Sequence, residues 1–243
     1  MLDQHFMIDK EVLVRIVNIA DLNREDNVLE IGPGEGALTE YILKIVKRVY
    51  AIEKDEKFVK VLQEKFGDNK NITFSFANAM EMNFPACNKC VSNLPYTLCE
   101  SLLWKFTRYP SYEMLVFTVP KKFTMALTGE KKSRLKLLVD IFYNIEVFDD
   151  IPPEAFNPPP KVVSSIIRLT PKENGNFFLR ELFKQYDKKT KNALRDILMK
   201  TGLNKRDAAM KVQLNLRPQL QNKSVMHLSM DEVQEVIKGF VGE

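Results

Sequence analysis

The chain has 243 residues, of which 45% are hydrophobic, so it can bury a full core and most readily forms one large and one small domain. No apolar run approaches the roughly 20 residues that cross a bilayer, and the first residues lack the regions of a signal peptide. Three cysteines, an odd number, fit reduced thiols better than a disulfide framework. We therefore expect a cytoplasmic protein with no membrane partner, acting as a monomer.

The formal net charge of +4 is unevenly distributed along the chain. Between Pro160 and Lys223 there are 15 Lys and Arg residues against 5 Asp and Glu residues, a net charge of +10, so the remainder carries −6. Such asymmetry indicates a basic face that binds a polyanion, with a solvated helical surface as the alternative.

Strands and helices alternate through the first two thirds of the chain. Apolar periodicity predicts helices over residues 9–22, 37–46, 55–66, 98–107, from about 120, and 135–142. Strands are predicted over residues 27–31, 49–52, 71–76, 113–118, 145–151 and 162–169, with one more ending at 90–92. This alternation implies an α/β fold with a doubly wound, Rossmann-like parallel sheet.

The pattern changes around residues 172–176, beyond which only helical patterns remain. They cover residues 177–186, 189–200, 205–214 and 230–240, and Ser229 and Glu232 have the spacing of a capping box for the last of them. We therefore predict an α/β domain over residues 1–172 and a small all-helical domain over residues 173–243.

A glycine-rich turn follows the strand predicted over residues 27–31. Gly32, Gly34 and Gly36 lack side chains, which lets backbone amides approach a ligand closely. Glu53, 21 residues after Gly32, ends the next predicted strand and is placed to accept hydrogen bonds from ribose hydroxyls. The pattern predicts a nucleoside-containing cofactor. It also fits the looser dinucleotide fingerprint, and a purely structural turn remains an alternative.

A rigid loop, Asn93-Leu94-Pro95-Tyr96, follows the end of another predicted strand. Pro95 fixes its own φ and biases Leu94 away from helix. Asn93 offers a carboxamide oxygen, Leu94 a backbone carbonyl, and Tyr96 a flat aromatic face. Two acceptors and a stacking surface suit a planar base with an exocyclic amine. A turn in which Asn caps a helix and Tyr packs is the alternative.

Three separated motifs resemble one enzyme family. Glu30 with the glycine turn resembles the S-adenosylmethionine loop of class I methyltransferases, and Asn-Leu-Pro-Tyr resembles their amino-methylating loop. Residues 155–165 read Ala-Phe-Asn-Pro-Pro-Pro-Lys-Val-Val-Ser-Ser, and residues 4–9 read Gln-His-Phe-Met-Ile-Asp. Together they resemble the KsgA-type ribosomal RNA adenine N6-dimethyltransferases, over residues 4 to about 170.

The resemblance implies roles for particular residues. The implied cofactor-binding residues are Gln4, His5, Glu30, Gly32, Gly34, Gly36, Glu53, Asn78, Ala79 and Asn93. The implied catalytic residues are Asn93, Leu94, Tyr96 and Phe156. The implied RNA-binding residues are Lys161, Lys188, Lys189, Lys191 and Arg195. Spacing alone would make Phe156 a core aromatic, whereas the resemblance places it beside the target base. His5 and Asn78 depart from the family, which usually has asparagine and aspartate there.

The implied activity is transfer of methyl groups from S-adenosylmethionine to adenine N6 in ribosomal RNA. The expected partner is ribosomal RNA in a small-subunit precursor, with dimethylation of two adjacent adenines near its 3′ end during ribosome assembly. A monomethylating or Erm-like large-subunit enzyme, and a non-catalytic assembly or RNA-binding relative, are alternatives. An oxidoreductase accounts for neither the 93–96 loop nor the basic tail. Cys87 and Cys90 lack partners at metal-ligand spacing, so we expect structural thiols and no metal.

Overall fold

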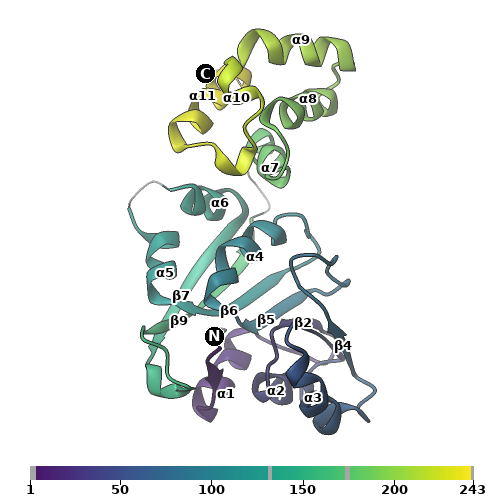
Figure 1. The fold of residues 1–243 in the computed structure, drawn as a ribbon, viewed down its shortest axis with the longest axis vertical. Coiled ribbons are helices and arrows are strands. Elements are labelled where there is room, and N and C mark those ends of the chain that lie inside the picture. Colours follow the sequence, from purple (N-terminus) through teal and green to yellow (C-terminus); the bar gives the residue numbers. More distant parts are fainter. Residues whose placement is uncertain (1–3, 131–132, 173–175, 242–243) are drawn as a thin grey trace. The chain divides into compact units, whose positions relative to one another are not determined.

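The computed structural model describes residues 4–130, 133–172 and 176–241 (Figure 1). They fall into two compact units. Residues up to 128 and residues 144–171 form the first, whereas residues 129–143 and those from 172 onward belong to the second. The predicted boundary at 172–176 includes residues 173–175, which lie outside the described part. The division into domains 1–172 and 173–243 stays a prediction.

A seven-stranded sheet forms the centre of the first unit, in the order β4-β3-β2-β5-β6-β9-β7. Its strands are β2 (Asn27–Ile31), β3 (Arg48–Glu53), β4 (Ile72–Phe76), β5 (Lys89–Asn93), β6 (Met114–Pro120), β7 (Tyr143–Ile151) and β9 (Ser164–Pro171). Strands β2 to β6 pair in parallel with their neighbours, and β9 pairs antiparallel with β6. The predicted α/β, doubly wound fold is confirmed, with one antiparallel addition.

Helices cover both faces of this sheet. They are α1 (Lys10–Ile19), α2 (Ala37–Leu43), α3 (Val59–Phe66), α4 (Cys99–Phe106) and α5 (Lys121–Thr128). Figure 1 shows α1 to α3 on one side of the strands and α4 and α5 on the other. Asp9 caps α1, because its side chain accepts from the amides of Glu11 and Val12. Helix α3 starts later than predicted, since a 3₁₀ turn at Glu56–Phe58 precedes it.

A second, two-stranded sheet was not predicted. It pairs β1 (Phe6–Met7) antiparallel with β8 (Phe156–Asn157). Strands of two residues carry no periodicity, so only the fold reveals this pairing. It ties the N-terminal segment to the Asn157-Pro158 region.

The second unit is helical. Its helices are α6 (Arg134–Phe142), α7 (Phe177–Lys184), α8 (Thr190–Lys200), α9 (Lys205–Asn215), α10 (Pro218–Gln221) and α11 (Met230–Val241). The predicted capping box is confirmed, since the Glu232 amide donates to Ser229 Oγ (3.2 Å) and the Ser229 amide donates to Glu232 Oε2 (2.6 Å). The short helix α10 was missed.

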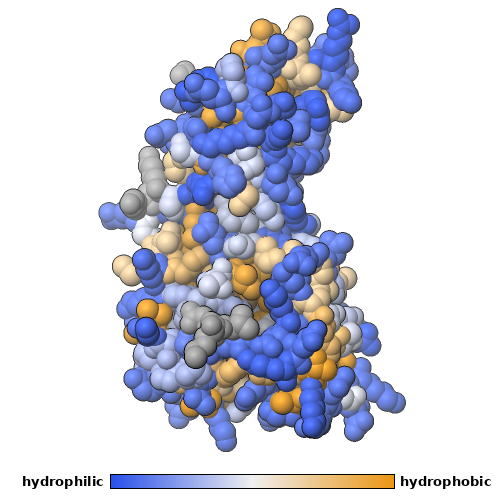
Figure 2. Space-filling view, in the orientation of Figure 1, coloured by the Kyte–Doolittle hydropathy of each residue, from blue (hydrophilic) through white to orange (hydrophobic). Residues whose placement is uncertain are grey.

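Most of the face drawn in Figure 2 is hydrophilic, with hydrophobic residues in scattered patches.

The three cysteines, Cys87, Cys90 and Cys99, are free and buried. Burial raises the pKa of the Cys87 and Cys99 thiols to about 12, so both are protonated and inert at neutral pH. Within the described ranges, no group of His, Cys, Asp and Glu side chains is arranged to hold a metal ion, and no helix is long and apolar enough to cross a membrane.

Candidate active site

A cavity of about 560 Å³ lies at the carboxyl ends of β2 and β5. The chain runs outward from β2 to β3 and β4 and then returns to β5 on the other side of β2. The loops that leave β2 and β5 therefore diverge, which makes this the usual ligand crevice of an open α/β sheet. Predicted site residues that line it are Gln4, His5, Glu30, Gly32, Gly34, Glu53, Asn93, Leu94 and Tyr96.

The glycine turn has the backbone that its sequence predicts. Gly34 and Gly36 have positive φ values of 56° and 83°. A Cβ on Gly34 would lie 2.7 Å from the Phe6 ring, and one on Gly36 would lie 2.5 Å from the Phe66 ring. Gly36 does not line the cavity, so the close packing of α3 against it explains why a side chain is absent at this position.

Glu53 links the glycine turn to the end of β3. Its side chain is almost fully buried, with Oε2 accepting from the Gly34 amide (3.0 Å) and Oε1 accepting from the Asp55 amide (2.8 Å). Each carboxylate oxygen can accept more than one hydrogen bond. The carboxylate is thus held rigidly at the cavity wall with capacity left for a pair of hydroxyl donors.

Glu30 is a second carboxyl group in the cavity wall, 1% exposed. Burial raises the pKa of Glu30 to about 8, the nearby charge of Glu53 adds to this, and a hydrogen bond from the Thr39 hydroxyl (2.6 Å) opposes it. Glu30 is therefore mostly protonated at pH 7. A cationic ligand in the cavity would favour the ionised form.

Asn93 ends β5 with a fixed amide orientation. Its Nδ2 donates to the carbonyl of His5 (3.0 Å), and because a carbonyl can only accept, the nitrogen must face it. Its Oδ1 therefore faces away from His5. That oxygen is buried, and among the described residues it has no hydrogen-bond partner. An unpaired buried acceptor costs about 1–3 kcal/mol, so a ligand that donates to it recovers this energy.

Tyr96 is held from two sides. Its hydroxyl lies 2.5 Å from Ser164 Oγ, and its ring centroid lies 5.8 Å from that of His5. The His5 ring is fixed in turn, since Nδ1 lies 2.8 Å from the Pro158 carbonyl and must donate to it. Leu94 is anchored through its amide to the Thr118 carbonyl (3.3 Å). The 93–96 loop is therefore preorganised.

Phe156 lies elsewhere. It is 2% exposed and packs in the hydrophobic core with Met7, Ile151 and Ala155. It does not line the cavity, so its position agrees with the core aromatic that spacing alone favours. Stacking of Phe156 on a base stays a prediction, and it requires the side chain to leave the core.

Asn78 and Ala79 also lie outside the cavity lining, in the loop after β4. The sequence analysis did not identify Phe6 as a site residue. Phe6 lines the cavity and packs edge-on against Phe58, with 5.4 Å between the ring centroids. Its place next to Gln4 and His5 was the only hint.

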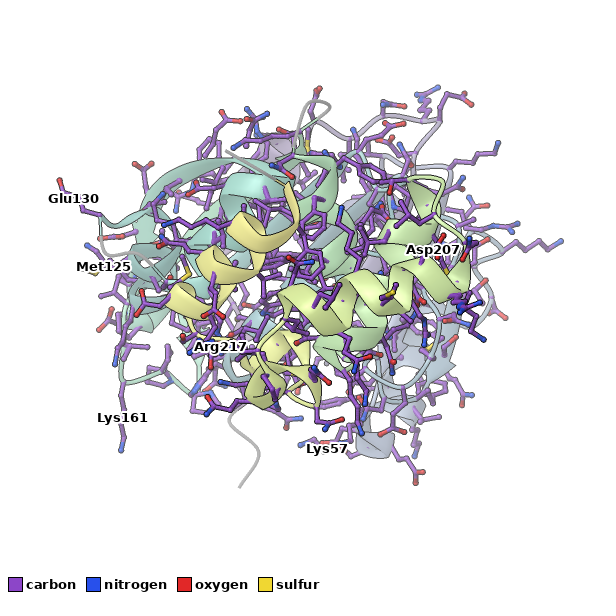
Figure 3. The ribbon with its side chains drawn as sticks, turned by 90° about the horizontal axis from the view of Figure 1, so that it is seen from above. Lys57, Met125, Glu130, Lys161, Asp207 and Arg217 are labelled. Carbon is purple, nitrogen blue, oxygen red and sulfur yellow. The ribbon has the colours of Figure 1, made fainter. Side chains whose placement is uncertain are left out.

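The implied RNA-binding residues divide between the two units. Lys161 belongs to the first unit, is exposed and extends away from the ribbon in Figure 3. Lys188, Lys189, Lys191 and Arg195 belong to the second unit, where the first two precede α8 and the other two lie within it. Lys188 pairs with Asp196 (2.9 Å), so part of its charge is already compensated.

Comparison with known proteins adds independent information. A family model described as ribosomal RNA adenine dimethylase matches residues 1–237. The probable ribosomal RNA small subunit methyltransferase A of Methanococcoides burtonii is 35% identical over 205 residues, covering 79% of this chain and 76% of that relative. The corresponding protein of Methanopyrus kandleri is 32% identical over 250 residues, covering 97% of this chain and 89% of that relative.

Two solved structures show the same fold. A dimethyladenosine transferase from Plasmodium falciparum is 22% identical, covers 98% of each chain and has a TM-score of 0.69. The 23S rRNA methyltransferase ErmE is 20% identical, covers 97% of this chain and 99% of the other, and has a TM-score of 0.66. At these identities the likeness concerns the fold alone.

Proposed function

Because the chain belongs to the ribosomal RNA adenine dimethylase family, we propose that it transfers methyl groups from S-adenosylmethionine to the N6 amine of adenines in ribosomal RNA. The relatives above are named as small-subunit methyltransferases, so the RNA of the small ribosomal subunit is the substrate. We expect two adjacent adenines near its 3′ end to be dimethylated during ribosome assembly. An Erm-like, large-subunit target has only fold likeness behind it.

The observation that carries this proposal is the unpaired Oδ1 of Asn93 at the cavity wall. An adenine amine has two hydrogens and is a poor nucleophile, because its lone pair is delocalised into the ring. If Asn93 Oδ1 and the Leu94 carbonyl accept these hydrogens, the nitrogen is drawn toward tetrahedral geometry. Such positioning can supply effective molarities as high as about 10⁵–10⁸ M.

The glycine turn and Glu53 form the part of the cavity that suits the cofactor. Glu53 lines the cavity with acceptor capacity left for ribose hydroxyls, and the turn at Gly32 and Gly34 allows close approach of the backbone. S-adenosylmethionine supplies an already activated methyl group on its sulfonium, so no strong general base is required. Tyr96 provides a stacking face for the target base, worth roughly 1–3 kcal/mol.

The direct test is a short incubation with labelled S-adenosylmethionine and one of three substrates: assembled small subunits, naked small-subunit RNA, or large-subunit RNA. Mapping of the modified base should find N6,N6-dimethyladenine in small-subunit RNA. Label in large-subunit RNA alone would favour the Erm-like alternative. An absence of label in every substrate would favour a non-catalytic binding role.

Proton release provides a test of Glu30. At pH 7 its carboxyl is mostly protonated, because the pKa of Glu30 is about 8. Binding of cationic S-adenosylmethionine should lower this pKa and release about one proton at pH 7, falling toward zero as the pH rises above about 8. Calorimetry in two buffers of different ionisation enthalpy measures the release. Glu30→Gln should abolish the proton release. An unchanged release in that variant would show that the proton does not come from Glu30.

The basic segment around the start of α8 should contribute to RNA affinity. Reversing Lys188, Lys189 and Lys191 to Glu should weaken RNA binding and flatten its dependence on salt, because each lost phosphate contact removes about 0.7–0.9 from the slope of log K against log salt. Affinity for S-adenosylmethionine should not change.

A matched control reverses three exposed lysines of the first unit, Lys47, Lys60 and Lys70. If this control flattens the salt dependence as much as the first variant, the effect comes from net charge and the segment is a solvated surface. Thermal unfolding of both variants detects any loss of fold, because the Lys188→Glu change places a second carboxylate beside Asp196.

A further inference from the structure

The antiparallel strand β9 brings its first residue to the active-site edge of the sheet. The parallel strands β5 and β6 end at this edge, at Asn93 and Pro120. Because β9 runs in the opposite direction, it begins there, and Ser164 is the register partner of Pro120. Ser164 is fully buried. A buried hydroxyl group therefore lies at the edge where the 93–96 loop starts.

This hydroxyl contacts a ring of the cavity wall. Ser164 Oγ lies 2.5 Å from the hydroxyl oxygen of Tyr96, and Tyr96 lines the cavity. Stacking needs only the face of an aromatic ring, which phenylalanine presents as well as tyrosine does. The hydroxyl of Tyr96 therefore adds a restraint and no stacking surface. It ties the far end of the ring to β9, so the plane of the ring depends on that strand as well as on its own loop.

A second restraint on the same ring comes from the segment that leads into β9. His5 Nδ1 donates to the Pro158 carbonyl (2.8 Å), and the centroid of the His5 ring lies 5.8 Å from that of Tyr96. Aromatic rings at this separation are in contact. Ser164 restrains Tyr96 directly and Pro158 restrains it through His5, although Ser164 is 68 residues away in the sequence. The 155–165 motif thus orients the aromatic residue of the 93–96 loop.

The start of β9 does not need this hydroxyl to stay in place. The strand pairs with β6 along its length, and the Lys121 amide donates to the Val163 carbonyl (2.9 Å). The next side chain, Ser165, points to the opposite face of the strand, where its Oγ donates to Asp150 Oδ1 (3.1 Å). Removal of the Ser164 hydroxyl should therefore leave the strand in position and release only the tyrosine ring.

We propose that Ser164 is a positioning residue for the target adenine, which holds the Tyr96 ring in the orientation on which the base stacks. The inference rests on the proposed function for the identity of that base. A ring that is already fixed loses little conformational freedom when the base arrives, so capture of the base is favoured. Ser164 does not line the cavity and acts through Tyr96. Its effect should appear in the capture of RNA and not in the methyl-transfer step.

The test is a double-mutant cycle of Ser164→Ala and Tyr96→Phe, read by single-turnover methylation of small-subunit RNA over a range of enzyme concentrations. Each single change removes one half of the hydrogen bond and keeps the aromatic ring. Each should raise the half-maximal enzyme concentration by about 2- to 12-fold, the net contribution of one hydrogen bond, with the saturated rate nearly unchanged. The double variant should resemble the single variants, because either change alone already breaks the bond.

Ser165→Ala is the matched control. It removes a buried hydroxyl from the same strand but from the opposite face, so it should not change the half-maximal concentration. Thermal unfolding compares the stability of Ser164→Ala with that of the control. Calorimetry should find wild-type affinity for S-adenosylmethionine in both variants.

An unchanged half-maximal concentration in Ser164→Ala would overturn the proposal, as would a further increase when Ser164→Ala is added to Tyr96→Phe. An equal effect of Ser165→Ala would assign the change to the strand as a whole and would also overturn it. So would a fall in the saturated rate or in cofactor affinity, since either would show general damage to the site. Failure of the proposed function is distinct, because it would appear in the wild type as an absence of methylated RNA and would remove the target base itself.

Discussion

Asn93→Ala is expected to slow single-turnover methylation by about 10²–10³ while affinity for S-adenosylmethionine and for RNA stays close to wild type. The substitution removes Oδ1, the buried acceptor that has no partner within the described chain. Stacking on Tyr96 and the cofactor contacts of Glu53 remain. The lost interaction is therefore one made chiefly in the transition state, when the amine nitrogen becomes tetrahedral.

A contrasting variant makes this result specific. Tyr96→Ala should weaken capture of the target base, since it removes a stacking face worth roughly 1–3 kcal/mol, and saturating RNA should recover part of the rate. Saturating RNA should recover nothing for Asn93→Ala. Methylation by Asn93→Ala at nearly the wild-type rate would show that Asn93 has only a structural role, holding the N-terminal segment through the His5 carbonyl.

Glu53→Ala should weaken binding of S-adenosylmethionine by about 1.5–3 kcal/mol, the value of a hydrogen bond to a charged group. This corresponds to a dissociation constant about 10 to 150 times larger. The carboxylate also holds the amides of Gly34 and Asp55, so its removal loosens the glycine turn as well. Glu53→Gln should not restore binding, because its NH₂ group would face one of these two N–H donors.

Calorimetry measures both variants. Glu56→Ala is the matched control, since Glu56 is exposed and only three residues away. Unchanged affinity in Glu53→Ala would refute the assignment of this carboxylate to ribose. Equal losses in Glu53→Ala and Glu56→Ala would point to general electrostatics.

Features that depend on short-range chemistry could be predicted from the sequence alone. The alternation of strand and helix patterns predicted the parallel sheet, and three closely spaced glycines marked the turn after β2, where all three have positive φ. The 93–96 loop was predicted from the rigidity of Pro95, and the capping box at Ser229 from its spacing. In such folds the connections of the chain set the order of the strands. This order brings the glycine turn and the 93–96 loop to the same edge of the sheet, where the cavity lies.

The orientation of these groups, in contrast, depends on contacts between distant parts of the chain. The amide of Asn93 is fixed by the carbonyl of His5, 88 residues earlier in the chain. Phe156 is buried because β8 pairs with β1, a contact between two-residue strands that no periodicity reveals. The raised pKa of Glu30 results from burial beneath the glycine turn, beside Glu53. Residue type and spacing specify which chemical groups are available, but orientation, burial and pKa depend on neighbours that are distant in sequence and become adjacent only when the sheet assembles.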